Sequence, residues 1–233
     1  MSESVPTEYD PIWETDIYSQ GQALNRYPFD LVVSFVYRHY PRNKARGNVK
    51  ILEIGCGAGN NLWFAAREGF SVTGIDGSAS AIEFACKRFA ADGLKGDFHV
   101  GDFINLPFED NSFDIVIDRA ALTCSGATAA RSTIQEVRRV LLPEGKFYFN
   151  PYSDRHASFS AGKPGPDGLR VDINGGTLVG IGPLYFYSKR EMFDIFNENT
   201  GWKMLSIRHI EWSEELQPKV DIHAEWIVIA QKV

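Results

Sequence analysis

The chain has 233 residues, of which 44% are hydrophobic and 13% aromatic, so it can bury a substantial core. Its net charge of −6 comes from interspersed acids and bases, which excludes a basic nucleic-acid-binding face. No run approaches the roughly 20 apolar residues of a membrane helix, and the three distant cysteines form no Cys-x-x-Cys pair, so we expect a cytoplasmic protein with neither a membrane partner nor structural zinc.

The first 27 residues lack the apolar stretch of a secretory signal peptide but are rich in aromatic side chains. Trp13 and Tyr18, together with Arg26, could form a lid over a ligand, because an arginine fork suits a carboxylate. The alternative is a tail that packs on the sheet, since aromatic rings bury area wherever they lie. Apolar residues then recur at helical spacing up to Pro41, which predicts a helix over 29–40.

Strand and helix patterns alternate over about the next hundred residues. Apolar runs predict five strands, at 51–54, 71–76, 98–100, 113–118 and 146–150. Helical patterns lie between them, at 60–68, from a Ser80–Glu83 capping box to Gly93, and at 134–141. Alternation at this βαβ spacing predicts an α/β fold with a doubly wound parallel sheet covered on both faces.

The rhythm breaks in residues 151–187, which are rich in Gly, Pro, Ser and Asp. The pair Gly175-Gly176 suggests a hairpin between 170–173 and 177–179. A second capping box, Ser188 with Glu191, then opens a further helix.

Two closing strands are predicted near 203–211 and 224–231, and they are too few to form a core alone. We therefore expect a single domain over residues 1–233. Its expected parts are an N-terminal lid and helix at 1–48, a ligand-binding core at 49–150, a substrate-side insertion at 151–187 and the closing helix and strands at 188–233.

Three alternate glycines join the first predicted strand to a helix, in the run Ile-Leu-Glu-Ile-Gly-Cys-Gly-Ala-Gly-Asn-Asn at 51–61. Such a turn leaves the backbone bare, so a ligand can lie against it and against the helix N-terminus. The spacing Glu-x-Gly-x-Gly-x-Gly differs from the Gly-x-Gly-x-x-Gly of dinucleotide-binding enzymes, because Asn60 stands where the last glycine would be.

Acidic residues lie at the carboxyl ends of the next three predicted strands. Asp76 ends the second strand, Asp102 follows the third, and Asp118 ends the fourth. Helix caps and turn formers explain such residues singly. Three of them at the edge where parallel sheets bind ligands predict a shared binding crevice.

Together these features resemble the class I S-adenosylmethionine-dependent methyltransferases over residues 49–150. The glycine turn is similar to motif I, residues 106–116 resemble the run before motif IV, and residues 141–146 resemble the turn before the fifth strand. The chain is similar to uncharacterised small-molecule bacterial methyltransferases, some associated with surface-glycan synthesis. The resemblance implies a Rossmann-like seven-stranded sheet in the order 3-2-1-4-5-7-6, with strand 7 antiparallel.

The resemblance also implies S-adenosylmethionine as the cofactor, with S-adenosylhomocysteine as the product. Asp76 would accept hydrogen bonds from the ribose hydroxyls, and Asp102 from the adenine amino group. The other residues implied around the cofactor are Trp13, Tyr18, Arg26, Glu53, Gly55, Cys56, Gly57, Asn60, Asn61, Gly77, Ser78, Gly101, Phe103, Asp118, Arg119 and Ala120.

The sulfonium methyl is already activated, so aligning the acceptor supplies much of the catalysis, roughly 7–11 kcal/mol. His156 is the preferred candidate for an optional general base because an imidazole titrates near neutrality; the alternative is a solvated loop histidine. Tyr152, Arg155 and Tyr187 are expected beside the substrate. No metal is expected, because Asn150-Pro stands where catechol-type O-methyltransferases have an Asp-Asn pair.

We therefore expect methyl transfer to a small-molecule or glycan acceptor, by O- or N-methylation. One alternative is a non-catalytic module that binds S-adenosylmethionine. A second is a nicotinamide-dependent dehydrogenase, which has no use for Glu53 or for Gly101-Asp102. A nucleic-acid methyltransferase is disfavoured by the acidic balance of the chain.

Overall fold

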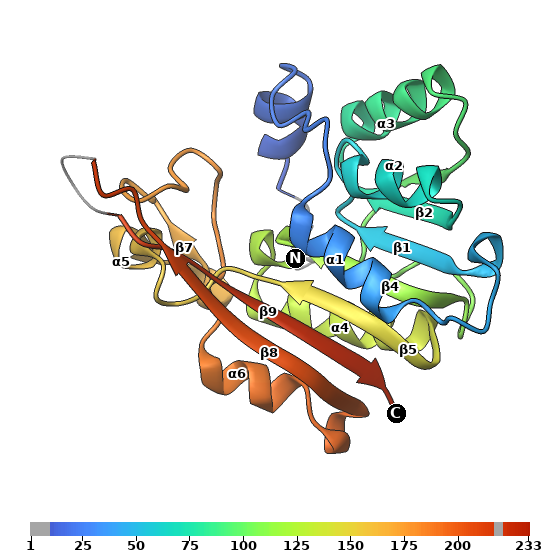
Figure 1. The fold of residues 1–233 in the computed structure, drawn as a ribbon. Coiled ribbons are helices and arrows are strands. Elements are labelled where there is room, and N and C mark those ends of the chain that lie inside the picture. Colours follow the sequence, from blue (N-terminus) through green and yellow to red (C-terminus); the bar gives the residue numbers. More distant parts are fainter. Residues whose placement is uncertain (1–9, 217–220) are drawn as a thin grey trace, which may run out of the picture.

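The computed structural model describes residues 10–216 and 221–233 (Figure 1). A seven-stranded sheet has the order β3-β2-β1-β4-β5-β9-β8. Its strands are β1 (Lys50–Ile54), β2 (Ser71–Asp76), β3 (Asp97–Val100), β4 (Phe113–Arg119), β5 (Leu141–Asn150), β8 (Trp202–Trp212) and β9 (His223–Lys232). The strands from β3 to β5 pair in parallel, and β9 runs antiparallel to both β5 and β8. The predicted sheet, with its antiparallel seventh strand, is confirmed.

Helices cover both faces of this sheet, as the alternating pattern predicts. They are α1 (Asp30–His39), α2 (Asn60–Arg67), α3 (Ala79–Ala91), α4 (Ala127–Val140) and α6 (Lys189–Ile195), whereas α5 (Ala157–Ala161) lies in the insertion (Figure 1). Helix α4 begins at Ala127, earlier than the predicted residue 134. Within the described ranges, no helix combines the length and the apolarity needed to cross a bilayer.

Two hydrophobic clusters hold these layers together, one on each face of the sheet. Val32 of α1 and Leu62 of α2 pack with Ile51 on one face. Leu52, the next residue of β1, packs with α4 on the other face. Successive residues of a strand point to opposite faces, so β1 is buried on both sides from Ile51 to Ile54.

The start of α3 differs from the predicted capping box. Ser78 caps the helix, and its hydroxyl accepts from the backbone N–H of Ala81 at 3.1 Å. The Asp76 side chain accepts from the backbone N–H of Ser78, so the chain turns into the helix immediately after β2. Ser80 is already inside the helix, and the predicted Ser80–Glu83 capping box is wrong.

The insertion also differs from its predicted hairpin. Its short strands β6 (Lys163–Pro164) and β7 (Arg170–Val171) pair through a turn at Pro166–Gly168, so the hairpin predicted at Gly175-Gly176 is wrong. Gly176 instead lies against helix α5, where an added Cβ would come within 2.3 Å of the Ser158 hydroxyl oxygen. Gly176 therefore allows its loop to approach the start of α5 closely.

The predicted capping box at α6 is confirmed, since the Ser188 hydroxyl accepts from the Glu191 backbone N–H and the Glu191 carboxylate accepts from Ser188. We expect Ser188→Ala to lower the free energy of unfolding by about 1 kcal/mol. Urea denaturation measures this loss. Ser132→Ala, inside α4, is the control and should not destabilise the protein, because alanine favours helix interiors. Equal losses in both variants would contradict the capping role.

Candidate functional site

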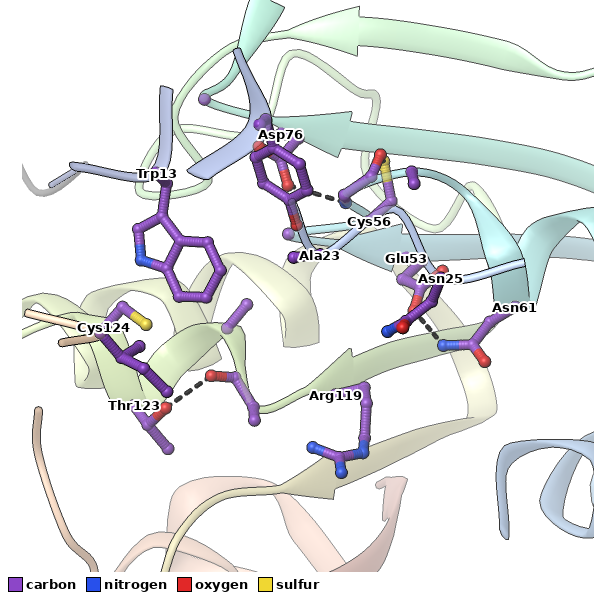
Figure 2. Close-up of a pocket in the computed structure, with 18 of the residues that line it drawn as sticks. Trp13, Ala23, Asn25, Glu53, Cys56, Asn61, Asp76, Arg119, Thr123 and Cys124 are labelled. Atoms are coloured by element: carbon purple, nitrogen blue, oxygen red, sulfur yellow. Dashed lines mark hydrogen bonds between the residues drawn. The ribbon is translucent and has the colours of Figure 1, made fainter. Parts of the chain in front are cut away.

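A cavity of about 260 Å³ lies at the carboxyl ends of the parallel strands (Figure 2). Three parts of the chain line it: the N-terminal segment from Asp10 to Phe29, the turns that follow β1, β2, β3 and β4, and the insertion. The predicted site residues that line it are Trp13, Tyr18, Glu53, Gly55, Cys56, Gly57, Asn60, Asn61, Asp76, Gly77, Phe103, Arg119, Ala120 and Tyr152. The structure therefore brings most of the predicted residues to one hollow.

The glycine turn forms the floor of this cavity. Gly55 has a φ of +60° and Gly57 a φ of +49°, in the left-handed region that disfavours other residues. A Cβ on Gly55 would lie 2.2 Å from the Ala121 Cβ, and one on Gly57 would lie 2.4 Å from the Tyr18 hydroxyl oxygen. Both positions thus favour glycine for conformation, and Gly55 also requires it for space, whereas the Tyr18 hydroxyl opposite Gly57 is the end of a side chain that can move.

Asp76 is fixed at the end of β2 by the backbone around it. One carboxylate oxygen accepts from the Gly57 N–H at 2.8 Å and the other from the Ser78 N–H at 2.8 Å. Burial raises the pKa of this carboxyl group. Each carboxylate oxygen retains acceptor capacity beyond these bonds, so Asp76 can also accept from hydroxyl groups of a ligand.

Glu53 presents an unsatisfied oxygen beside the cavity. Its side chain is only 2% exposed, and one oxygen accepts from the Asn61 side-chain amide at 2.6 Å. The other oxygen is buried without a hydrogen-bond partner among the described residues. Burial raises the pKa of Glu53 to about 8, and the nearby carboxylates of Asp118 and Asp76 add to this shift. The site suits a cation that could pair with the orphaned oxygen.

Asp118 shapes the turn after β4 from below the surface. One carboxylate oxygen accepts from the N–H groups of Ala121 at 2.9 Å and Leu122 at 3.0 Å. These bonds hold Ala120 at a φ of +62°, a strained conformation for alanine. Asp118 itself does not line the cavity, and burial raises its pKa to about 7. Its role in the structure is to position Arg119 and Ala120.

The N-terminal segment is fastened over the cavity by Glu14. The Glu14 carboxylate accepts from the Ser80 hydroxyl at 2.6 Å and from the Ser78 hydroxyl, at the start of α3. Trp13 and Tyr18, the first and last residues of a π-helix, line the cavity. Figure 1 shows this segment beside α3, above the strand ends. This position supports the interpretation as a lid.

The family model that matches this chain describes a methyltransferase domain and covers residues 51–145. This range contains the glycine turn, Asp76 and the turn after β4. Together with the order of the sheet, the match supports a class I S-adenosylmethionine-dependent methyltransferase. The cofactor that this family implies is S-adenosylmethionine.

Similar proteins include two with named methyltransferase activities. The chain is 39% identical over 110 residues to a phthiotriol/phenolphthiotriol dimycocerosates methyltransferase of Mycobacterium tuberculosis, covering 46% of this chain and 38% of that protein. It is 31% identical over 167 residues to norajmaline N-methyltransferase of Rauvolfia serpentina, covering 70% of this chain and 55% of that protein. The match thus spans about two fifths of the Mycobacterium relative.

A solved structure of similar fold is a SAM-dependent methyltransferase from Methanosarcina mazei. Its TM-score is 0.68 at 23% sequence identity, and the match covers 89% of this chain and 99% of that chain. At this level of identity the likeness concerns the fold. It agrees with the sheet order of the class I methyltransferases described above.

Features of the cavity itself fit the cofactor of the methyltransferase family. Glu53 has an unpaired buried oxygen for an ammonium group, and Asp76 has spare acceptor capacity for hydroxyls. Phe103 offers an aromatic side chain in the lining. The glycine turn leaves room for a ligand against bare backbone. Among the described residues, no cluster of three His, Cys, Asp or Glu side chains could hold a metal ion.

Four residues predicted to contact the cofactor lie outside the cavity lining, in addition to Asp118. Ser78 is fully buried as the cap of α3, and Gly101 donates its N–H to the Asp76 carbonyl. Asp102 is exposed and accepts from the Ile104 N–H at 3.1 Å. Arg26 is also exposed, and its carbonyl accepts from Arg88. Contacts from Asp102 and Arg26 to a bound cofactor stay predictions.

His156, the predicted general base, lies away from the cavity lining. Its ring is buried, Nδ1 accepts from the Ser158 N–H at 3.0 Å, and Nε2 lies 3.1 Å from Nδ1 of His223. Burial lowers the pKa of both histidines to about 4. His156 caps α5, and its position argues against a general-base role.

Two predicted substrate residues also lie elsewhere. Tyr187 is buried in the core, with its ring edge-on to Phe149 and its centroid at 5.2 Å. Arg155 is exposed and pairs with Glu211 on β8. Of the three predicted substrate residues, Tyr152 alone lines the cavity.

The buried histidine pair makes stability depend on pH. Both histidines bind protons in the unfolded chain before they do in the folded protein, so the pair contributes a loss of unfolding free energy as the pH drops from 6.5 towards 4. Glu53 and Asp118, whose pKa values burial raises, contribute in the opposite direction, but they are common to the wild-type protein and His223→Gln and cancel in the difference between the two. We therefore expect the unfolding free energy of the wild-type protein minus that of His223→Gln to fall over this pH range, as measured by urea denaturation. A difference that does not change with pH would contradict the assignment.

Sequence reasoning missed several lining residues. Thr123 and Cys124 lie on the 3-10 helix after Asp118, so their position in the turn after β4 could have indicated them. Ile181 and Leu184 come from the insertion, which matches no motif and gives no such signal. The others missed are Asp10, Ala23, Asn25, Phe29, Ala58 and Ala121.

Proposed function

We propose that this protein transfers a methyl group from S-adenosylmethionine to a small-molecule or sugar acceptor, by O- or N-methylation. The observation that carries this proposal is the single cavity that joins Asp76 and the glycine turn to the insertion. One side of it suits the adenosyl and methionine parts. The other side, lined by Arg119, Tyr152, Ile181 and Leu184, is the proposed place of the acceptor. The small-molecule names of the two relatives support this class of acceptor.

The proposed roles of the chain's own residues follow from their geometry. Asp76 binds the ribose hydroxyls, and Glu53, oriented by Asn61, binds the ammonium group. Gly55 and Gly57 leave the backbone bare beneath the ligand. When bound, S-adenosylmethionine supplies an activated methyl group. The described lining residues include no histidine, so we propose that the site acts mainly by aligning the acceptor and excluding water.

The first test is the binding of S-adenosylhomocysteine, followed by turnover. Calorimetry should show binding to the wild-type protein, while NADH should not compete. Transfer of radiolabelled methyl groups to small molecules of a cell extract should then be detectable. Binding without transfer to any fraction would favour the alternative, a non-catalytic module that binds S-adenosylmethionine. Competition by NADH would favour the dehydrogenase alternative.

Proton release on binding tests the role of Glu53. The pKa of about 8 keeps this group largely protonated at pH 7, and an ammonium group beside it would favour the carboxylate. We expect the binding of S-adenosylhomocysteine at pH 7 to release up to about one proton. Calorimetry in two buffers of different ionisation enthalpy measures it. Glu53→Gln should abolish the release, and equal release in both proteins would contradict the role.

A further inference from the structure

The insertion side of the cavity contains one cationic side chain. Arg119 follows Asp118 at the end of β4 and is the single Lys, Arg or His among the described residues that line the cavity. Its guanidinium carbon lies 4.3 Å from the centre of the Phe29 ring. Figure 2 shows the guanidinium pointing away from Glu53 and Asn61.

Most of the hydrogen-bonding capacity of Arg119 is unused. A guanidinium group has five N–H donors. Its nearest carboxylate, Glu225 on β9, lies 3.7 Å away, and that oxygen has no hydrogen-bond partner among the described residues. Burial raises the pKa of Tyr152 to about 12, and the positive charge of Arg119 nearby opposes this rise. The Arg119 side chain is only 19% exposed, so its unused donors are largely shielded from bulk water.

The surroundings of Arg119 define the chemistry of a ligand that would reach it. Tyr152, Ile181 and Leu184 come from the insertion side and supply aromatic and aliphatic surface. Trp13 of the N-terminal segment adds a further aromatic wall (Figure 2). The carboxylates of Asp76, at the end of β2, and Glu53, in β1, lie on the proposed cofactor side, and Asp10 of the N-terminal segment is the third carboxylate of the lining. A ligand with a carboxylate group and an apolar body matches this arrangement. The planar carboxylate can accept two parallel N–H bonds from the arginine, and the apolar body can pack against the aromatic and aliphatic side chains.

We propose that Arg119 and Tyr152 form a carboxylate-binding subsite for the methyl acceptor, which is therefore a small organic acid with an apolar body. This inference rests on the proposed function. The subsite holds the acceptor by its acidic group and so fixes its orientation towards the cofactor. The ion pair with Glu225 is too long for a hydrogen bond, so Arg119 can turn towards the acceptor without breaking one.

Acids and their neutral amides test the subsite directly. Benzoate, phenylacetate and octanoate would be titrated by NMR into the protein saturated with S-adenosylhomocysteine, each beside its amide. We expect at least one acid to bind at least tenfold more tightly than its amide. Arg119→Gln should remove this preference, Arg119→Lys should restore part of it, and Tyr152→Phe should reduce it.

Arg190→Gln is the matched control, since Arg190 is exposed on α6 and pairs with Asp194 there. It should keep the preference for acids. The subsite is overturned if none of the three acids is preferred over its amide, or if Arg119→Gln and Arg119→Lys both keep the wild-type preference. Thermal melting of each variant verifies that it is folded.

A second experiment tests whether Arg119 binds the carboxylate of the acceptor or that of the cofactor. S-adenosylhomocysteine has a methionine-type carboxylate, and 5′-methylthioadenosine lacks it. We expect Arg119→Gln to bind both as the wild-type protein does. A loss of at least tenfold for S-adenosylhomocysteine alone would assign Arg119 to the cofactor and overturn the proposal. A wild-type protein that binds neither compound would instead refute the proposed function.

Discussion

Asp76→Ala is expected to weaken the binding of S-adenosylhomocysteine about 10- to 100-fold. The buried carboxylate is the proposed acceptor for the ribose hydroxyls, and hydrogen bonds to a charged group contribute about 1.5–3 kcal/mol each. The same carboxylate also accepts from the N–H groups of Gly57 and Ser78. Its removal therefore loosens the glycine turn as well as the ribose contact.

Calorimetry with S-adenosylhomocysteine measures the effect, and Asp76→Asn separates its two parts. Asparagine keeps one oxygen that can accept from either backbone N–H, so it should preserve more of the turn but lose the charge. Asp97→Ala is the matched control, because Asp97 is an exposed acid at the start of the neighbouring strand β3. Wild-type affinity in Asp76→Ala would refute the assignment of this residue to the ribose.

Gly55→Ala is expected to lower the free energy of unfolding by about 2–5 kcal/mol, the sum of two costs. The left-handed backbone conformation costs alanine roughly 1–2 kcal/mol relative to glycine, and forcing a methyl group into a packed site costs roughly 1–3 kcal/mol. The second cost arises because the new Cβ would lie 2.2 Å from the Ala121 Cβ. Relaxation of this contact should also displace the turn after β4, which directly follows Arg119.

Gly93→Ala is a matched control that isolates the steric part. Gly93 has a similar φ of +65°, but an added Cβ there would meet nothing within 4 Å. It should lose only the conformational cost, roughly 1–2 kcal/mol, in urea denaturation. Equal losses in the two variants would show that the contact with Ala121 is relieved without cost.

The side of the cavity proposed to bind the cofactor could be predicted from the sequence because it depends on local order along the chain. A residue that ends a parallel strand must lie at the carboxyl edge of the sheet, and Asp76 and the glycine turn do line the cavity there. Side-chain direction was less predictable. Asp102 also follows a strand, yet its carboxylate accepts from the Ile104 N–H and lies outside the cavity lining.

The insertion could not be predicted in the same way, because its contacts join residues far apart in the sequence. His156 is buried against His223, which lies on β9, the last strand along the sequence. Nothing near His156 in the sequence indicates that partner, or the burial that lowers its pKa. Ile181 and Leu184 reach the cavity only through the path of the whole insertion.

Strand β9 has a consequence for how the protein matures on the ribosome. It is inserted between β5 and β8, so the β5 edge of the parallel half has no neighbour until residue 232 has been synthesised. A nascent chain that has formed the parallel half therefore exposes backbone donors and acceptors along β5. Such an open edge is a template for pairing with other chains. Translation speed over the last strands then sets how long the growing chain is at risk of aggregation.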